Sequence, residues 1–325
     1  RMFITGGVGA IHEDEKFGPD YFLPTDAYLE TCAAVGAGFF SQRMNQLTCN
    51  ARYMDEVERV LYNNVLTGVS LSGDKYTYQN PLNTDKPDRW EWHVCPCCPP
   101  MFLKIMAAMP GYIYAYQGDN VYVNLFIGSE VRIPVGDNSV RLKQLTSYPW
   151  HGAVSIQVNP DKASTFSMKV RIPGWAQGTE NPYDLYQSNL KAPVKLKVNQ
   201  EDVLLRIVDG YAEINQEWKK GDHIELELPM QPRLITANKA VENLRGQVAL
   251  ASGPIIYCFE DADNPELQTF KLQAQTPLEL SHDSNLLNGV NIIKCQGDIP
   301  AKAIPYYAVA NREESHSYKV WIPQK

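Results

Sequence analysis

The first third of the chain carries apolar side chains at helical spacing. Between residues 28 and 40 they recur three or four positions apart, and Thr25 or Asp26 can cap a helix that starts just before them. A second helix is expected over residues 52–66. A third is expected to start at Pro99-Pro100, because proline lacks the N–H that a first helical turn leaves unpaired. The pattern therefore predicts a helical segment.

The spacing changes near residue 115, after which apolar and polar positions alternate. Turn signals such as Gly118-Asp119 and Gly136-Asp137 separate the alternating runs. Strands are expected at 120–127, 167–172, 211–214, 223–228, 247–251, 254–259, 308–310 and 318–322. We interpret this pattern as two β-sandwich domains behind a helical one. The expected divisions are residues 1–114, 115–232 and 233–325.

Composition and charge exclude several classes of protein. The 325 residues are 44% hydrophobic and 21% charged, an ordinary globular balance that allows two or three domains. The net charge of −7 argues against a nucleic-acid-binding protein, which would show a basic face. No apolar run approaches the length of a membrane span. Residues 1–7 have no start-like character, so the chain is expected to begin within a domain, and a signal peptide upstream stays open.

Seven cysteines are present, and three of them fall within residues 95–98. An odd number in a chain of this length is not a disulfide scaffold, so the clustering indicates a metal site or reactive thiols. Cys97 and Cys98 directly precede the helix expected at Pro99-Pro100, and a helix N-terminus favours thiolate. Thiolate both binds zinc and attacks carbon. The alternatives are a zinc knuckle without catalysis and simply buried thiols.

Glu30 and Cys32 supply a second candidate pair. Residues two apart do not share a face of a regular helix, so either the backbone is irregular there or only one of the two is a ligand. Together with Cys97 and Cys98 they would form a Glu-Cys₃ site, a donor set that zinc accepts. The alternative is that Glu30 is an exposed helical carboxylate and Cys32 a thiol of the core.

The acidic loop at residues 12–16 is a third candidate. Such a loop is usually solvated surface, but one of its carboxylates could act as a general acid in a pocket that raises its pKa. The spacing alone does not select one. Tyr76, Tyr78, Trp90 and Trp92 surround the cysteines in sequence. Aromatic rings suit the faces of sugars, and they suit any protein core equally well.

Taken together, these motifs resemble the β-L-arabinofuranosidase family, glycoside hydrolase family 127, and its close relative family 146. The N-terminal blocks that carry the resemblance are Phe3-Ile4-Thr5-Gly6-Gly7, His12-Glu13-x-Glu15, Glu30-Thr31-Cys32-Ala33, Leu61-Tyr62-Asn63, Asn80-Pro81-Leu82 and Cys97-Cys98-Pro99-Pro100. Later blocks include Val170-Arg171-Ile172-Pro173-x-Trp175, Trp218-Lys219-x-Gly221-Asp222, Gly253-Pro254-x-x-Tyr257 and Ile304-Pro305-Tyr306-Tyr307. The resemblance covers essentially the whole chain.

The resemblance implies the C-terminal part of an (α/α)₆ barrel followed by two β-sandwich domains, with Zn²⁺ as cofactor. By motif, the zinc ligands would be Glu30, Cys32, Cys97 and Cys98, with Cys97 as nucleophile, Glu15 as acid/base, Cys95 as a neighbour that is not a ligand, and His12 and Tyr78 as substrate-binding residues. The family usually has Asn where this chain has Met101. Barrel histidines that line the sugar pocket of the family have no counterpart here.

The expected activity is a retaining glycoside hydrolase that releases terminal β-L-arabinofuranose from an oligosaccharide or plant glycan. One rival is an inactive or truncated carbohydrate-binding protein with a structural zinc. Another keeps the enzyme but changes the sugar, for instance to an acidic residue of pectin. Neither nucleic acid nor membrane is expected as a partner. A homodimer stays open, as does the choice between a bacterial cytoplasm and periplasm.

Overall fold

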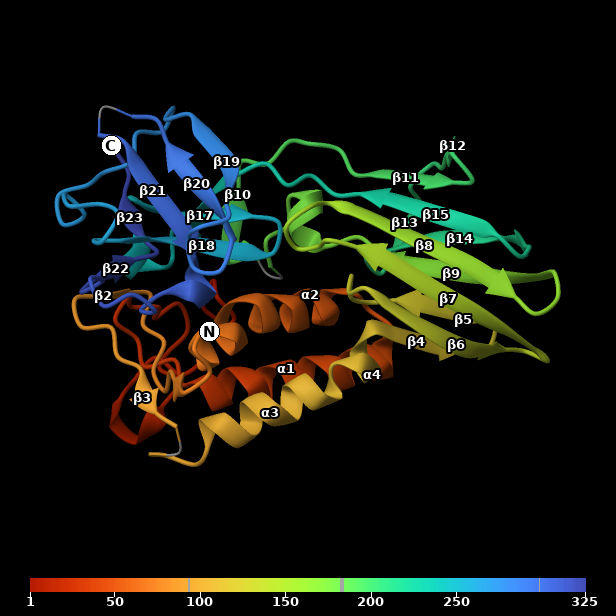
Figure 1. Ribbon diagram of the computed structural model, residues 1–325, viewed down its shortest axis with the longest axis horizontal. Coiled ribbons are helices and arrows are strands. Elements are labelled where there is room, and N and C mark those ends of the chain that lie inside the picture. Colours follow the sequence, from red (N-terminus) through yellow and green to blue (C-terminus); the bar gives the residue numbers. More distant parts are fainter. Residues whose placement is uncertain (93, 182–183, 298) are drawn as a thin grey trace.

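The computed structural model describes residues 1–92, 94–181, 184–297 and 299–325. Helices occur in the N-terminal third and sheets make up most of the remainder, with the helices lying along one side of the sheets (Figure 1). The fold is therefore mixed α and β, with few helices and mostly sheet, as the alternation along the sequence predicts. In the described part of the chain, no helix has both the length and the apolar character needed to cross a bilayer.

The helical part is organised around its longest helix, which runs from Thr31 to Thr48. Helix α1 contacts both α2 and α3, and its buried residues include Val35. The helices are η1 (Glu13–Glu15), α1 (Thr31–Thr48), α2 (Arg52–Arg59), the π-helical η2 (Val60–Val65), η3 (Leu66–Gly68), α3 (Cys98–Ala108) and α4 (Pro110–Ile113). The second predicted helix is confirmed as the continuous run from α2 through η3. The third starts one residue before Pro99, as its prolines predict.

The predicted start of the first helix is wrong. We expected it to start just after Thr25 or Asp26, but α1 begins at Thr31. Leu29 has a φ of +46° and Glu30 is extended, so neither can continue a helix. The cause is a long-range contact, because Glu30 forms a β-bridge with Gln79. The apolar spacing extends into residues that the rest of the fold holds out of the helix.

The middle part of the chain forms two sheets that share one core. One sheet has the order β12-β11-β15-β8-β7-β6 and the other β13-β14-β9-β5-β4. Along β8, alternate side chains are buried, so one face of its sheet lies against the core. The strands are β4 (Tyr114–Gln117), β5 (Asn120–Val123), β6 (Ser129–Val135), β7 (Asn138–Thr146), β8 (Ala153–Pro160), β9 (Ser164–Arg171), β11 (Lys195–Val198), β12 (Glu201–Asp202), β13 (Ile207–Val208), β14 (Tyr211–Trp218) and β15 (Asp222–Glu227).

The last part is built around a sheet whose central strands, β17 and β18, are buried on both faces. Its main order is β10-β16-β17-β18-β21-β20-β19, and β22 joins it to β2 of the helical part. These strands are β10 (Tyr186–Ser188), β16 (Arg233–Ala237), β17 (Gln247–Ser252), β18 (Ile255–Glu260), β19 (Leu278–Asp283), β20 (Val290–Cys295), β21 (Ala301–Pro305), β22 (Tyr318–Lys319), β23 (Ile322–Pro323), β1 (Lys75–Tyr76), β2 (Asn83–Thr84) and β3 (Trp90–Glu91).

Three strand predictions need correction. The strand expected at 120–127 ends at Val123. The strand expected at 308–310 is absent, because a 3₁₀ turn, η7 (Tyr306–Ala308), precedes Ala310, whose φ is +54°. The strand expected at 318–322 is divided between β22 and β23, which pair with different neighbours. Apolar runs of this length do not reveal where the partner strand ends.

Buried ion pairs connect the helical part to both sheet regions. Arg171 of β9 pairs with Asp55 and Glu58 of α2, with the Asp55 contact at 2.6 Å. Arg233 of β16 pairs with Glu180 at 2.6 Å, and the backbone carbonyl of Glu180 accepts a hydrogen bond from the α2 arginine Arg59. Helix α2 is thereby fixed from both sides, which holds the helical part in one position against the sheets.

Candidate active site

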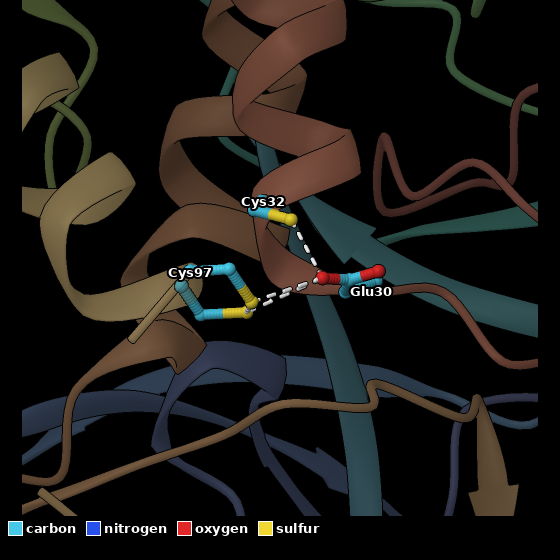
Figure 2. Close-up of side chains that lie close together, drawn as sticks. Glu30, Cys32 and Cys97 are labelled. Atoms are coloured by element: carbon cyan, nitrogen blue, oxygen red, sulfur yellow. Dashed lines mark hydrogen bonds between the residues drawn. The ribbon is translucent and has the colours of Figure 1, made fainter. Parts of the chain in front are cut away.

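Glu30, Cys32, Cys97 and Cys98 lie close together, with one ligand atom from each within 4.8 Å of the others. The Oε1 atom of Glu30 is 2.6 Å from the Cys32 sulfur, 3.3 Å from the Cys97 sulfur and 3.8 Å from the Cys98 sulfur. Figure 2 shows the Cys32 and Cys97 sulfurs pointing towards the Glu30 carboxylate from two different helices. The structure therefore brings together all four residues that the motifs predict as ligands.

The residues around Glu30 explain how it reaches the cysteines. Glu30 precedes α1 as an extended residue. The next residue, Thr31, donates from its hydroxyl to the Thr77 carbonyl at 2.7 Å. The amide of Asn80 donates to the Leu29 carbonyl and to the Thr31 hydroxyl. Of the two alternatives left by the sequence, a locally irregular backbone is the correct one, and it allows both Glu30 and Cys32 to contribute.

Cys97 and Cys98 lie at the start of α3, with Cys97 as its N-cap residue. The two prolines that follow have no N–H group, so the first turn of α3 needs no hydrogen-bond partner at their positions. Cys95 is held by Tyr76, whose hydroxyl contacts both its backbone N–H and its carbonyl. The Cys95 sulfur is 3.5 Å from that of Cys97 and is not one of the four clustered ligand atoms.

The cluster gathers acidic groups without a basic partner. Among the described residues, no Lys, Arg or His forms an ion pair with Glu30, which is 6% exposed. Burial, together with hydrogen bonds with Cys95 and Glu30, raises the pKa of Cys97 to about 12, against the opposing effect of hydrogen bonds with Cys98 and Tyr78. The pKa of Cys98 is raised by Cys32 and by burial. A bound cation would reverse these shifts, so the donor set fits a metal ion.

Glu15 lies at the end of η1 and is connected to the cluster through tyrosines. Its carboxylate accepts hydrogen bonds from Tyr28 at 3.1 Å and Tyr78 at 3.4 Å. Burial raises the pKa of Tyr28 to about 12, so its hydroxyl keeps the proton that it donates. Tyr78 interacts with both Glu15 and Cys97. His12 packs edge-on against Tyr28, with ring centres 5.0 Å apart.

An aromatic wall, defined here as Tyr76, Tyr78 and Trp90, lies beside these groups. Trp90 stacks on Tyr78 with ring centres 4.8 Å apart and planes 13° from parallel. Tyr76 contacts Trp90 edge-on and also binds Cys95. Of the aromatic residues that the sequence left undecided between a sugar platform and a core, Tyr78 is thus in contact with candidate catalytic residues.

Two residues of this region are not predicted by the sequence pattern. The apolar spacing assigns Tyr28 to the first helix, whereas its hydroxyl donates to Glu15. Arg89 belongs to no motif, and it donates to the Thr67 carbonyl at 2.8 Å and to the Val309 carbonyl at 2.8 Å. Burial lowers the pKa of Arg89 to about 10. A lone arginine next to Trp90 in a polar loop was the only signal available.

Three family models match the chain in consecutive segments. They are the catalytic domain of β-L-arabinofuranosidase GH127 over residues 1–111, the middle domain over 120–230 and the C-terminal domain of glycoside hydrolase family 127 over 232–323. The chain belongs to glycoside hydrolase family 127.

Family 127 relatives agree with this assignment. A non-reducing end β-L-arabinofuranosidase from Bifidobacterium longum is 31% identical over 96% of the chain and 52% of its own length. A solved GH127 β-arabinofuranosidase is 36% identical with a TM-score of 0.94, over 100% of this chain and 54% of its own. A GH127 β-L-arabinofuranosidase from Geobacillus stearothermophilus T6 is 35% identical with a TM-score of 0.91, over 100% and 55%. The chain therefore spans about half the length of these relatives.

Proposed function

We propose that the protein is a retaining glycoside hydrolase that releases terminal β-L-arabinofuranose from an oligosaccharide or plant glycan. The observation that carries the proposal is the contact of Tyr78 with both Glu15 and Cys97, since it places a carboxylate and a thiol beside one aromatic wall. The names of the family 127 relatives, β-L-arabinofuranosidases, support the choice of sugar. The helical part would belong to an (α/α)₆ barrel, followed by β-sandwich domains with divisions near residues 114 and 232.

Zn²⁺ is the proposed cofactor, held by Glu30, Cys32, Cys97 and Cys98. Three thiols and one carboxylate suit zinc better than calcium or magnesium, which prefer oxygen donors. Zinc would supply positive charge that keeps the Cys97 sulfur as thiolate. The Oε1 atom of Glu30 lies within hydrogen-bond distance of all three sulfurs, so the carboxylate also orients the Cys97 side chain.

In the proposed reaction, the Cys97 sulfur attacks the anomeric carbon and the bond to the leaving oxygen breaks. Glu15 gives its proton to that oxygen, and a thioglycosyl bond to Cys97 is formed. Glu15, now a carboxylate, takes a proton from water, which attacks the same carbon and frees the Cys97 sulfur. Tyr28 and Tyr78 orient the Glu15 carboxylate, and two inversions at one carbon retain its configuration.

The test uses an aryl β-L-arabinofuranoside as substrate. It measures the anomeric configuration of the first product and the metal content of the protein. We expect the β-anomer of arabinose as the first product by NMR, together with one bound zinc per chain by elemental analysis. A first product of the α-anomer would exclude the two-step scheme. Bound zinc without turnover would support the rival proposal, a carbohydrate-binding protein with a structural metal.

A second experiment separates the two roles of Glu15. In Glu15→Gln the first step loses its acid, so a substrate with a poor leaving group should slow by about 10²- to 10⁴-fold. A good leaving group needs little protonation and should slow less in that step. Glu13→Gln, a change in the same acidic loop, is the matched control and should leave both substrates unaffected. Equal losses on both substrates in Glu15→Gln would remove Glu15 from the acid role.

A further inference from the structure

A cavity of about 770 Å³ lies between the middle sheet region and the last one. Residues 150–153 and 227–231 form one side, and residues 280–282 of β19 together with Asn291 of β20 form the other. None of the described residues that line it belongs to the candidate active site. The volume falls within the roughly 300–1,000 Å³ that is usual for small-molecule sites.

A second cavity, of about 350 Å³, adjoins the first over strands β8, β11 and β15. The two share Ala153, Lys195 and Glu227 as lining residues. The partly exposed side chain of Leu145 on β7 extends the second cavity across the same sheet. The combined space is therefore elongated, which suits a ligand made of several units in a row.

Contacts between the two sheet regions hold the walls of the first cavity. The Asn291 amide donates to the Trp150 carbonyl at 3.0 Å, which connects β20 to the turn before β8. The Oδ1 atom of Asn291 lies 3.0 Å from Nδ1 of His282, so the imidazole is held on the same wall. The N–H of Leu228 donates to the Gly152 carbonyl at 3.0 Å. A cavity with walls connected in this way is formed before any ligand is bound.

Several polar side chains that line the first cavity have no partner within the described protein. The Ser281 hydroxyl is buried and makes no hydrogen bond with a described residue. An unpaired buried hydroxyl is costly, and a hydroxylated ligand would remove that cost. In the described part of the chain, no hydrogen bond or ion pair is made by the side chains of His151, Lys195, Glu227 and Gln231. The cavity thus offers donors and acceptors to its occupant.

The chemistry of the lining favours an uncharged, hydroxylated ligand. Lys195 faces Glu227 across β11 and β15, and Lys197 faces Glu225 in the same register, so positive and negative charges are balanced. A hydroxyl group can donate to a carboxylate and accept from an ammonium group, whereas an ionised ligand is repelled by one of the two. The partly buried Trp150 adds an aromatic ring to the wall. A ring beside donors and acceptors is suited to a saccharide.

We propose that this cavity is a second carbohydrate-binding site, which binds an uncharged oligosaccharide and takes no part in bond cleavage. The adjoining cavity over β8, β11 and β15 would hold further sugar units of the same chain. The proposal goes beyond the proposed function and does not depend on it, because neither zinc nor Cys97 takes part in binding here. In a hydrolase that acts on chain ends, such a site would tether the glycan and raise the effective concentration of its ends.

The test measures binding of a neutral linear α-L-arabino-oligosaccharide by titration calorimetry. Its linkages are α, so the proposed reaction does not cleave it and the wild-type protein can be used. Ala192→Trp places an indole in the cavity and should raise the Kd by at least about tenfold, equivalent to roughly 1.4 kcal/mol. Ala163→Trp makes the same change in the exposed β8–β9 turn and should leave the Kd unchanged.

A second measurement locates the bound sugar and tests its charge. The NMR signal of the Trp150 indole N–H should shift on adding the neutral oligosaccharide, and an oligogalacturonide should bind at least about threefold more weakly. Equal Kd values for wild type and Ala192→Trp, or an unmoved Trp150 signal, would overturn the second site and leave the proposed function intact. Equal binding of the oligogalacturonide would overturn the preference for an uncharged ligand. Binding of the neutral oligosaccharide by a protein that hydrolyses no aryl β-L-arabinofuranoside would support this site while the proposed function fails.

Discussion

Two clusters of acidic side chains in the helical part differ in how their charge is balanced. On α2, Asp55 and Glu58 face Arg171, whose side chain is fully buried. Burial lowers the pKa of Arg171, but Glu58 and Asp55 raise it more, so the guanidinium stays charged. Tyr148 and Trp175 also donate to Glu58, which leaves this cluster well supplied with donors.

The cluster at Glu30 has no such partner. Glu30 and three thiols share a small space, and among the described residues none supplies a compensating positive charge. At Arg171 one guanidinium faces two carboxylates, and burial raises the pKa of Asp55 to about 6 despite it. The protein supplies the partners of this cluster, which therefore serves the structure. The Glu30 cluster, in contrast, would need a bound cation to balance its charge. Groups whose pKa is perturbed in this way concentrate at functional sites.

The largest expected effect is on activity, in the unbalanced cluster. Cys97→Ser should lower kcat by at least about 10³-fold, equivalent to roughly 4 kcal/mol of transition-state stabilisation, because the serine hydroxyl is a far weaker nucleophile. Circular dichroism should show the same fold. Cys49→Ser, which changes a cysteine outside the cluster, is the control and should keep full activity. Normal turnover by Cys97→Ser would remove Cys97 from the mechanism.

In the balanced cluster the largest effect should be on stability. Arg171→Met leaves the buried Glu58 and the partly buried Asp55 without their guanidinium and should lower the free energy of unfolding by about 3–5 kcal/mol. Urea denaturation measures this change. Arg132 pairs with Asp161 at the surface, so Arg132→Met should change stability much less. If the two variants lose equal stability, burial does not distinguish the two ion pairs.

Removing the metal should destabilise the protein through the Glu30 cluster alone. With free zinc at about 100 times its Kd, binding contributes roughly 2.7 kcal/mol, which a chelator would remove. Differential scanning calorimetry should show a lower midpoint in the chelator and recovery with added zinc. In Glu30→Gln the chelator effect should shrink, whereas Glu13→Gln should respond like wild type. A midpoint in wild type that is insensitive to both chelator and zinc would contradict the proposed metal site.

The smallest effect concerns the dependence of stability on pH. Burial raises the pKa of Glu180, but Arg233 and Arg59 lower it more, so the folded value lies below the ordinary 4.5. The stabilisation is therefore present above pH 4.5 and is lost as the pH falls through the lower folded value. Glu180→Gln should flatten this part of the profile in urea unfolding, whereas the exposed Glu201→Gln should not. Parallel profiles of wild type and Glu180→Gln would contradict the lowered pKa.

Short stretches of sequence predict much of the candidate site. The position of Cys97 and Cys98 at a helix start follows from the prolines beside them, and α3 begins there. The alternation also predicts sheets after residue 115. It does not predict several strands of the middle region, including β6 to β8. Local propensity is therefore informative about which kinds of element form.

The remaining features depend on residues that are distant in sequence. Glu30 is extended because Gln79 pairs with it and Asn80 binds its neighbours, and no local pattern encodes this. For the same reason Tyr28, predicted to lie within a helix, points its hydroxyl at Glu15. Arg89 donates to the carbonyls of Val309 and Ala310, which lie more than 200 residues away in the sequence. Such contacts are set by the tertiary fold and not by periodicity.

The connection from Arg89 to Val309 and Ala310 has a consequence for the order of synthesis. Chains emerge from the ribosome N-terminus first, and domains generally fold as they appear. Glu15 and the four clustered residues at 30–98 are therefore made before residues 309–319, and the loop that carries Trp90 receives these contacts only when those later residues have been added. The candidate catalytic residues are thus synthesised before the wall beside them is fixed, so a nascent chain would combine the two only after residues 309–319 have been added.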